Sequence, residues 1–227
     1  MGERKKSVII LSFLITVTFS CSKDRFPNQQ SAFEYFPLVL GKAKEYDVER
    51  TTYSLSSLPE KQRFITRQLV IDTFKMPDNQ VAYKIEHFAQ NNRAEWKLDS
   101  VSAAWQTSDK TTTRENGQTV INMIYPLSNG LEWNGNSFNN NGASFWRVTN
   151  LGKSFQTKFS IFQNTVTIIR QDDSTFLSRN TYIEVYALNV GLIRREKSFL
   201  KYCGDPDCLG KGIINYGWKE LSSIRNY

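Results

Sequence analysis

The chain has 227 residues, of which 40% are hydrophobic and 13% aromatic, and its formal net charge is +7. This length is enough for one good-sized domain with its own core. The charge is spread along the chain, not gathered in the dense Lys/Arg stripe of a nucleic-acid surface, so we expect no nucleic-acid partner. A single histidine, His87, removes most zinc sites, which need several His or Cys ligands. We therefore expect no metal and no cofactor.

Residues 1–20 have the pattern of a secretory signal. A basic "MGERKK" precedes the uncharged apolar run "VIILSFLITVTF", and the small residue Ser20 stands directly before Cys21. The apolar run is shorter than the roughly 20 residues that span a bilayer core. We expect this signal segment to be helical and separate from the folded domain.

Cys21 resembles the cysteine of a bacterial lipoprotein signal, which is lipidated and becomes the first mature residue. The alternative is ordinary secretory cleavage before Cys21, since Thr18 and Ser20 are small enough for that enzyme too. Lipidation also explains the odd number of cysteines, because it leaves Cys203 and Cys208 as a pair. Two acyl chains would anchor the protein stably in a membrane.

This interpretation predicts the organisation and the location of the protein. After the signal peptide, residues 21–32 form a polar tether, and residues 33–227 form a single β-rich domain. The membrane, reached through lipidated Cys21, is the expected partner. We expect an outer-membrane anchor in a bacterial cell envelope, with the domain on the periplasmic face.

The body of the chain alternates between apolar and polar residues, which is the pattern of half-buried strands. In "QVAYKIEHF", Tyr83 and Ile85 share one face with His87, so His87 is interpreted as a hydrogen-bonded residue at the core edge. "SFQTKFSIF" (154–162) alternates in the same way and predicts another strand. The longest basic cluster, "RREK" (194–197), is interrupted by Glu196. It is interpreted as a solvated strand edge, where charge discourages edge pairing, in preference to a binding patch.

Turn signals separate these strands. Asn-Gly pairs in "ENGQ", "SNGL" and "WNGN" supply residues that tolerate positive φ, as tight turns need. "MPDNQ" and "RQDDST" predict two more turns, the second placing Asp172 and Asp173 in a solvated hairpin. The fold class is therefore all-β: a single antiparallel meander sheet of about ten strands, strongly curved or closed into a barrel-like shape.

"CGDPDC" (203–208) is the sharpest local motif. A Cys203–Cys208 disulfide closing a small turn fits an exported protein, and Asp-Pro favours a turn. The alternative is a metal site in which the two thiolates act with Asp205 and Asp207, a mixture of soft and hard ligands that is unusual.

Three stretches together resemble an uncharacterised lipoprotein family of Bacteroidota. These are "FEYFPLVLGKAKEYDV" (33–48), "LEWNGNSFN" (131–139) and "EVYALNVGLIRREKSF" (184–199), which carry the phrases FPL..G, WNGN and Y..NVGL. A tryptophan of the family is replaced here by Lys44. The resemblance implies an exported β-rich lipoprotein and transfers no catalytic residue. From the residues alone, "WNGN" is interpreted as the end of a strand followed by a turn. Gly191 is interpreted as a bulge or a close backbone approach inside a strand.

No pattern in the sequence indicates catalysis, and no nucleophile elbow G-x-S-x-G is present. The favoured function is a non-enzymatic envelope lipoprotein that acts as a binding or structural module, with no catalytic residues assigned. The alternatives are a carrier of lipid or another apolar ligand in a curved-sheet cavity, and a hydrolase of envelope polysaccharide.

Overall fold

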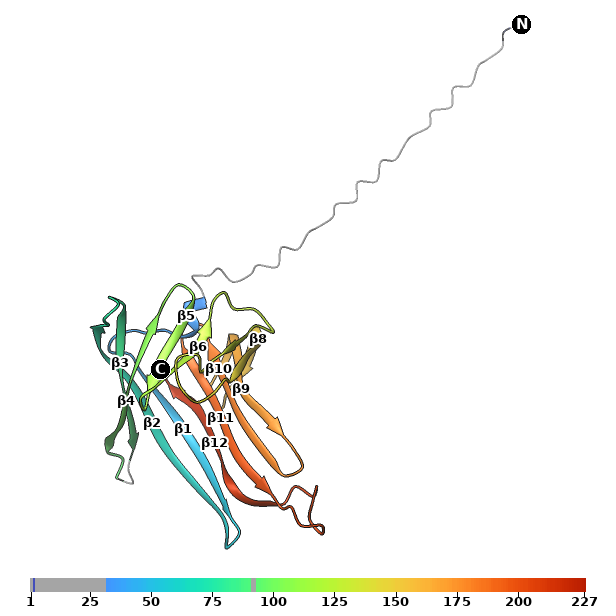
Figure 1. Cartoon of the computed structure of the whole chain (residues 1–227). Coiled ribbons are helices and arrows are strands. Elements are labelled where there is room, and N and C mark those ends of the chain that lie inside the picture. Colours follow the sequence, from blue (N-terminus) through green and yellow to red (C-terminus); the bar gives the residue numbers. More distant parts are fainter. Residues whose placement is uncertain (1, 3–31, 91–92) are drawn as a thin grey trace.

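The structure of the protein is a computed structural model, and it describes residues 2, 32–90 and 93–227. Within this part the chain forms one antiparallel sheet of 12 strands that is nearly closed into a barrel (Figure 1). A single turn of 3-10 helix, η1 (Phe33–Tyr35), precedes the sheet. The strands are β1 (Ala43–Ser54), β2 (Ser57–Lys75), β3 (Val81–Gln90), β4 (Trp96–Gln106), β5 (Lys110–Glu115), β6 (Gln118–Ile124), β7 (Glu132–Asn134), β8 (Phe145–Gln156), β9 (Ile161–Ser174), β10 (Ser178–Ala187), β11 (Gly191–Tyr202) and β12 (Ile214–Asn226).

The sheet consists of two meanders joined by the terminal strands. Its order is β6-β5-β4-β3-β2-β1-β12-β11-β10-β9-β8-β7, so β1 and β12 pair in the centre. The expected all-β fold and its curvature are confirmed, with 12 strands in place of about ten. Sequential strands pair because short hairpins leave them adjacent.

The two edges of the sheet, β6 and β7, meet and complete the barrel-like shape. The Ile121 N–H donates to the Gly135 carbonyl over 2.9 Å, and the indole N–H of Trp133 donates to the Ile121 carbonyl over 2.8 Å. The Asn139 amide donates to the Thr119 carbonyl over 2.9 Å. These bonds satisfy edge groups that would otherwise be open to another strand.

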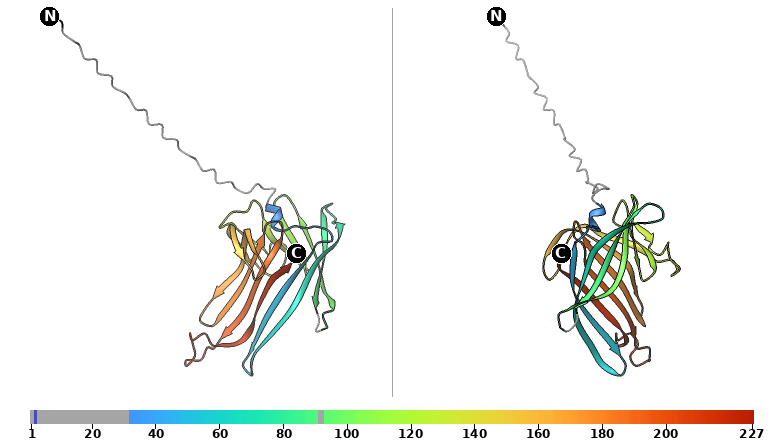
Figure 2. Two further views of the ribbon diagram at one scale, coloured as in Figure 1. Left: turned by 180° about the vertical axis from the view of Figure 1, so that it is seen from behind. Right: turned by 90° about the vertical axis from the view of Figure 1, so that its left-hand side faces the viewer.

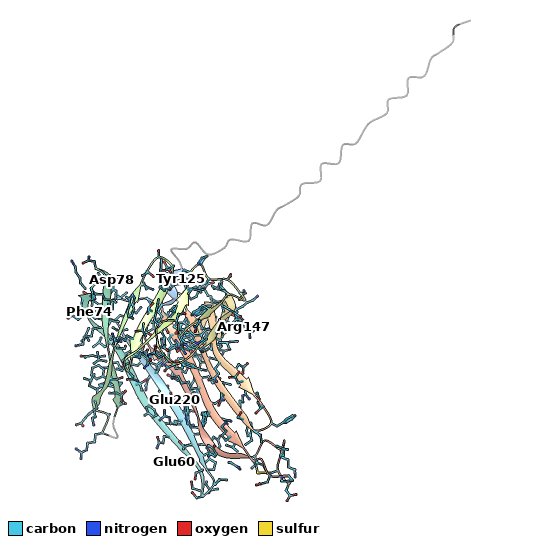
Figure 3. All side chains as sticks on the ribbon, in the orientation of Figure 1. Glu60, Phe74, Asp78, Tyr125, Arg147 and Glu220 are labelled. Atoms are coloured by element: carbon cyan, nitrogen blue, oxygen red, sulfur yellow. A yellow bond between two sulfur atoms is a disulfide. The ribbon has the colours of Figure 1, made fainter. Side chains whose placement is uncertain are left out.

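The 3-10 turn η1 covers one end of the interior. Tyr35 is buried, and the ring of Phe33 packs edge-on against Tyr125, with ring centroids 4.7 Å apart. Figure 3 shows Tyr125 at this end and Glu60 at the far end, on the β1–β2 hairpin. The hairpins β1–β2, β9–β10 and β11–β12 reach farther toward that far end than the short strands β5, β6 and β7, as both views of Figure 2 show.

The Asn-Gly turn of "ENGQ" is confirmed. Asn116 and Gly117 have φ values of 49° and 76° and join β5 to β6 as a two-residue hairpin. The turn of "MPDNQ" joins β2 to β3, with Asn79 at φ 65°.

Two local predictions are wrong. "SFQTKFSIF" is a hairpin and not one strand, since β8 ends at Gln156 and β9 begins at Ile161. The hydroxyl oxygen of Thr157 accepts the N–H groups of Phe159 and Ser160 and so stabilises a turn that alternation alone cannot reveal. Likewise Asp172 and Asp173 lie within β9, and the turn follows at residues 175–177, where the Thr175 hydroxyl plays the same part.

The interpretation of "RREK" as a strand edge is also wrong. These residues lie on β11, which pairs with β10 and β12 on its two sides. Arg194 and Glu196 point to the outer face, whereas Arg195 and Lys197 point inward, opposite Glu184 and Tyr182 of β10. A charged run is tolerated in a central strand because the inward charges find partners inside the barrel.

Candidate functional site

A buried carboxylate stands at the centre of the interior. Glu184 of β10 has no exposed surface. The Nε of Arg195, its cross-strand neighbour on β11, lies 2.7 Å from Glu184 Oε1, and the Nη2 of Arg170 on β9 lies 2.7 Å from Oε2. The hydroxyl of Tyr186 donates to Oε2 over 2.8 Å. Both carboxylate oxygens are therefore occupied by charged or strong donors.

Arg170 connects this carboxylate to the rest of the barrel. Its guanidinium carbon lies 4.1 Å from the ring centroid of Trp146 and 4.6 Å from that of Tyr182. It also donates to the side-chain oxygen of Asn122 on β6. Cation–π contacts of this kind strengthen where water is excluded. One cluster of side chains thus links β6, β8, β9 and β10 across the interior.

The electrostatics of the cluster keep the carboxylate charged. Burial by itself would raise the pKa of Glu184, but the guanidiniums of Arg170 and Arg195 lower it to about 2. Burial, with the nearby Glu184, raises the pKa of the Tyr186 hydroxyl well above its ordinary value. A carboxylate that is ionised and fully hydrogen-bonded has no proton to give at neutral pH, so the arrangement favours a structural or ligand-positioning role over acid catalysis.

A small cavity adjoins this cluster on the side of η1. Its volume is about 50 Å³. The segment 36–38 covers it, and strands from both meanders line it. The polar lining includes His87, whose Nε2 lies 2.7 Å from the Ser102 hydroxyl oxygen. Burial lowers the pKa of His87. The expectation of a hydrogen-bonded histidine at the core edge is confirmed.

The outer face carries a larger hollow, here called the lateral groove. Its volume is about 400 Å³, and the β8–β9 turn forms one wall although β8 and β9 are not neighbours of β1 or β2 in the sheet. The ring of Phe162 packs against Tyr227, with centroids 5.9 Å apart, and the guanidinium of Arg194 lies 5.9 Å from the ring of Phe155. These contacts hold the hairpin across β11 and the end of β12. The lining residues are Asp47, Val48, Glu49, Arg63, Phe64, Ile65, Lys158, Phe159, Arg194, Leu221 and Ser223.

A second hollow of about 270 Å³ continues the groove along β11 and β12. The two share Glu49, Arg194 and Leu221 and together present side chains of both charges. Several of these charges already form ion pairs: Arg63 with Glu49 at 3.0 Å, and Arg194 with Glu196 at 3.2 Å. The groove is therefore polar along its length, with apolar side chains between the charges.

The structure brings Cys203 and Cys208 together as a disulfide. Asp205 is close enough to complete a group of three potential metal ligands with them, but the two sulfur atoms are bonded to each other. Cys21, the tether up to residue 31 and the signal peptide lie outside the described residues. In the part of the chain that the structure describes, no helix has the length and apolar character needed to cross a membrane.

The "WNGN" and "NVGL" phrases have structural roles. The indole of Trp133 donates to β6, and the side-chain oxygen of Asn134 accepts the N–H groups of Asn136 and Ser144. Gly191, at φ 91°, begins β11, and a Cβ there would lie 2.6 Å from Lys44 Nζ. The predicted close approach at Gly191 is confirmed, although it occurs at the start of the strand and not inside it.

Sequence reasoning missed the interior cluster. The one available signal was the alternation of Tyr182, Glu184 and Tyr186, which places a charged residue between two large ones on the same face of a strand. That signal does not predict which residues pair with Glu184. Arg170 lies on another strand and reaches the interior at a bulge in the β9–β10 pairing.

Comparison with known proteins gives two solved structures of similar shape. No protein-family model and no curated protein matched the sequence. A crystal structure described as a "putative lipoprotein" from Parabacteroides distasonis is 13% identical, with a TM-score of 0.39, over 84% of this chain and 98% of that chain. Another, described as a "putative exported protein with YmcC-like fold" from Bacteroides fragilis, is 14% identical, with a TM-score of 0.35, and the match again covers 84% of this chain and 98% of that chain. Likenesses at this level decide nothing about activity.

Proposed function

We propose that the protein is an exported cell-envelope lipoprotein whose domain is a non-enzymatic binding module, and that the lateral groove receives an extended polypeptide segment of a partner protein. One observation carries the proposal: the β8–β9 turn crosses the outer face and encloses a groove of about 400 Å³ with β1, β2 and β12. Ligand sites in proteins have volumes of about 300–1,000 Å³. The envelope location rests on the signal pattern and Cys21.

The chemistry of the groove fits a peptide. Phe159 at the tip of the turn is 50% exposed and can act as an aromatic anchor, the kind of residue that dominates many interfaces. Lys158 and Arg194 offer donors to carboxylates and carbonyl groups, while Asp47 and Glu49 accept from backbone amides or basic side chains. All strands beneath the groove already pair on both sides, so recognition would use side chains and not an added strand.

The two alternative functions find less support. The cavity inside the barrel has a volume of about 50 Å³ and four cationic side chains in its lining, which does not suit an acyl chain. A polysaccharide hydrolase would need two carboxyl groups across a cleft. Asp47 and Glu49 lie in the groove, but Arg225 holds Asp47 at 3.2 Å and Arg63 holds Glu49 at 3.0 Å.

Binding can be tested with variants of the exposed β8–β9 turn. The double variant Lys158→Glu, Phe159→Ala alters only exposed side chains of the groove wall. The matched control is Lys153→Glu, an exposed residue of β8 that does not line the groove. Tagged wild type and variants are expressed in the source cells and cross-linked. Proteins joined to them are identified by mass spectrometry.

We expect one partner to be recovered with the wild type and the control and lost at least tenfold with the double variant. A synthetic peptide from the cross-linked segment should then compete. Equal recovery with the double variant would contradict a role for the groove. Turnover of a fluorogenic glycoside by the wild type, abolished by Asp47→Asn, would instead favour the hydrolase.

A further inference from the structure

The small interior cavity has an excess of positive charge. Four cationic side chains line it: Lys42, Lys44, Arg170 and Arg195. The negative groups that face these cations are Glu115, which also lines the cavity, and Glu184, which is bound by both arginines. Lys197 lies farther along the interior, with its Nζ 4.3 Å from the ring centroid of Tyr182. The cavity is therefore an electropositive space inside the domain.

Lys44 stands out among these cations. Arg170 and Arg195 are paired with Glu184, and the ammonium of Lys42 lies 3.4 Å from the Asn189 carbonyl. Lys44 is partly buried and lines the cavity, yet within the described residues its ammonium has no hydrogen-bond or ion-pair partner. Burial, with the charge of Lys42, lowers its pKa to about 8, so the side chain remains mostly protonated at neutral pH. A charge that is partly removed from water and has no counter-charge is costly.

The fold holds Lys44 in this position. The segment between η1 and β1 covers the cavity and is fixed by backbone hydrogen bonds between Gly41 and Val70 (2.8 Å) and between Val70 and Lys42 (3.2 Å). The Gln106 amide also donates to the Phe36 carbonyl over 3.1 Å. On the other side, Gly191 leaves room for the ammonium, since a Cβ at that position would meet it. Closing the barrel thus places an unpaired ammonium against a small cavity between the two meanders.

The geometry points to a binding site for a small oxyanion in this cavity, with the ammonium of Lys44 as its counter-charge and Lys42 and Gln68 as further donors. A single water needs about 10–15 Å³ of such space, so about 50 Å³ accommodates a few waters or one ion of the size of phosphate, sulfate or a carboxylate group. This site is distinct from the lateral groove and does not depend on the proposed partner.

The first test is the thermal stability of the full chain in phosphate. A ligand that binds only the folded state stabilises it by mass action. With inorganic phosphate at ten times its dissociation constant, the melting temperature should rise by roughly 3–6 °C relative to chloride at equal ionic strength. Phenyl phosphate in place of phosphate identifies the source: a similar rise indicates a group at the end of a larger molecule, and no rise indicates a free ion. The absence of a rise with phosphate, sulfate and acetate alike would overturn the proposal.

The second test assigns the effect to Lys44. The variant Lys44→Met removes the charge and keeps an unbranched side chain, so we expect it to melt no lower than the wild type in chloride and to lose the response to phosphate. The matched control Lys211→Met, at an exposed position of the β11–β12 loop, should keep the full response. A full response in Lys44→Met would place the anion elsewhere and overturn the assignment.

A measurement on the wild type keeps the proposal testable if Lys44→Met does not fold. NMR titration of the lysine side chains should show two groups with pKa values near 8 in chloride, Lys44 and Lys197. Phosphate should raise the pKa of Lys44, because the bound anion stabilises its ammonium. Lys197, whose pKa burial also lowers to about 8, serves as the internal comparison and should change less. An equal change in both would contradict a local site at Lys44.

Discussion

At the scale of single residues, a fully buried carboxylate needs positively charged or hydrogen-bonding groups next to it. Glu184 meets two guanidiniums at 2.7 Å and a tyrosine hydroxyl at 2.8 Å. Such a group adds little stability relative to an apolar residue, but breaking it leaves uncompensated charge in a low-dielectric interior. A nearly isosteric substitution of Glu184 should therefore have a large effect on the free energy of unfolding.

We expect Glu184→Gln to lower the free energy of unfolding by about 3–5 kcal/mol, because Arg170 and Arg195 would lose their shared counter-charge. Urea denaturation monitored by tryptophan fluorescence measures the change. The control is Glu132→Gln, since Glu132 is half-exposed and 3.9 Å from Arg147, and it should change stability by no more than about 0.5 kcal/mol. A change below about 1 kcal/mol in Glu184→Gln would show that the cluster tolerates the missing charge.

The same residue predicts a pH dependence. The pKa of Glu184 is about 2 in the folded protein against an ordinary value of 4.5. A carboxyl group with a depressed folded-state pKa stabilises fully above pH 4.5, and that stabilisation is lost as the pH falls toward 2. The free energy of unfolding should therefore fall more steeply over this range in the wild type than in Glu184→Gln. A difference between the two proteins that stays constant from pH 6 to 2 would contradict the assigned pKa.

At the scale of elements, the short strand β7 and its turn decide whether the barrel closes. Gly135 donates its N–H to the Ser144 carbonyl at 2.8 Å and accepts from Ile121 of the opposite edge. A Cβ at Gly135 would overlap the indole of Trp146, which in turn packs on Trp133 and Arg170. This glycine is needed for close approach, and its φ is not in the left-handed region.

Gly135→Ala should lower the free energy of unfolding by roughly 1–3 kcal/mol, because the indole of Trp146 has to move in a packed interior. The near-ultraviolet circular dichroism of the tryptophans should change as well. Gly204→Ala is the control, since its Cβ would lie 3.4 Å from the nearest side-chain atom, an ordinary contact. Equal stability of the two variants would mean that the β6–β7 junction can relax.

At the scale of the whole molecule, η1 and the longest hairpins lie at opposite ends of the domain. The twelve residues from Cys21 to Ala32 limit the separation of the ends of that segment to about 40 Å. The hairpins of β1–β2, β9–β10 and β11–β12 lie at the end of the domain away from η1 (Figure 1). If Cys21 is lipidated, these hairpins point away from the membrane. Their tips expose Leu58, Phe176 and Ile213.

The anchor predicts a change of location for one variant. Cys21→Ser should move the protein from the membrane fraction to the soluble fraction of the envelope, because the lipid chains supply stable attachment. The intact mass of the wild type should correspond to a chain that begins at Cys21 with a diacylglycerol and a fatty acyl group. Recovery of Cys21→Ser in membranes, or an unmodified wild-type mass, would favour ordinary secretory cleavage.

The sequence by itself determined the class of fold, because alternation with a period of two and Asn-Gly turns are local properties that each strand and hairpin carries alone. His87 and the Cys203–Cys208 pair followed from local patterns too. Only the tertiary structure decided where charges lie. Arg195 and Lys197 in "RREK" face Glu184 and Tyr182 because β11 is central, and strand order comes from long-range pairing that local sequence does not contain. The position of Lys44 beside the interior cavity and the shape of the lateral groove also depend on contacts between strands that are distant in sequence.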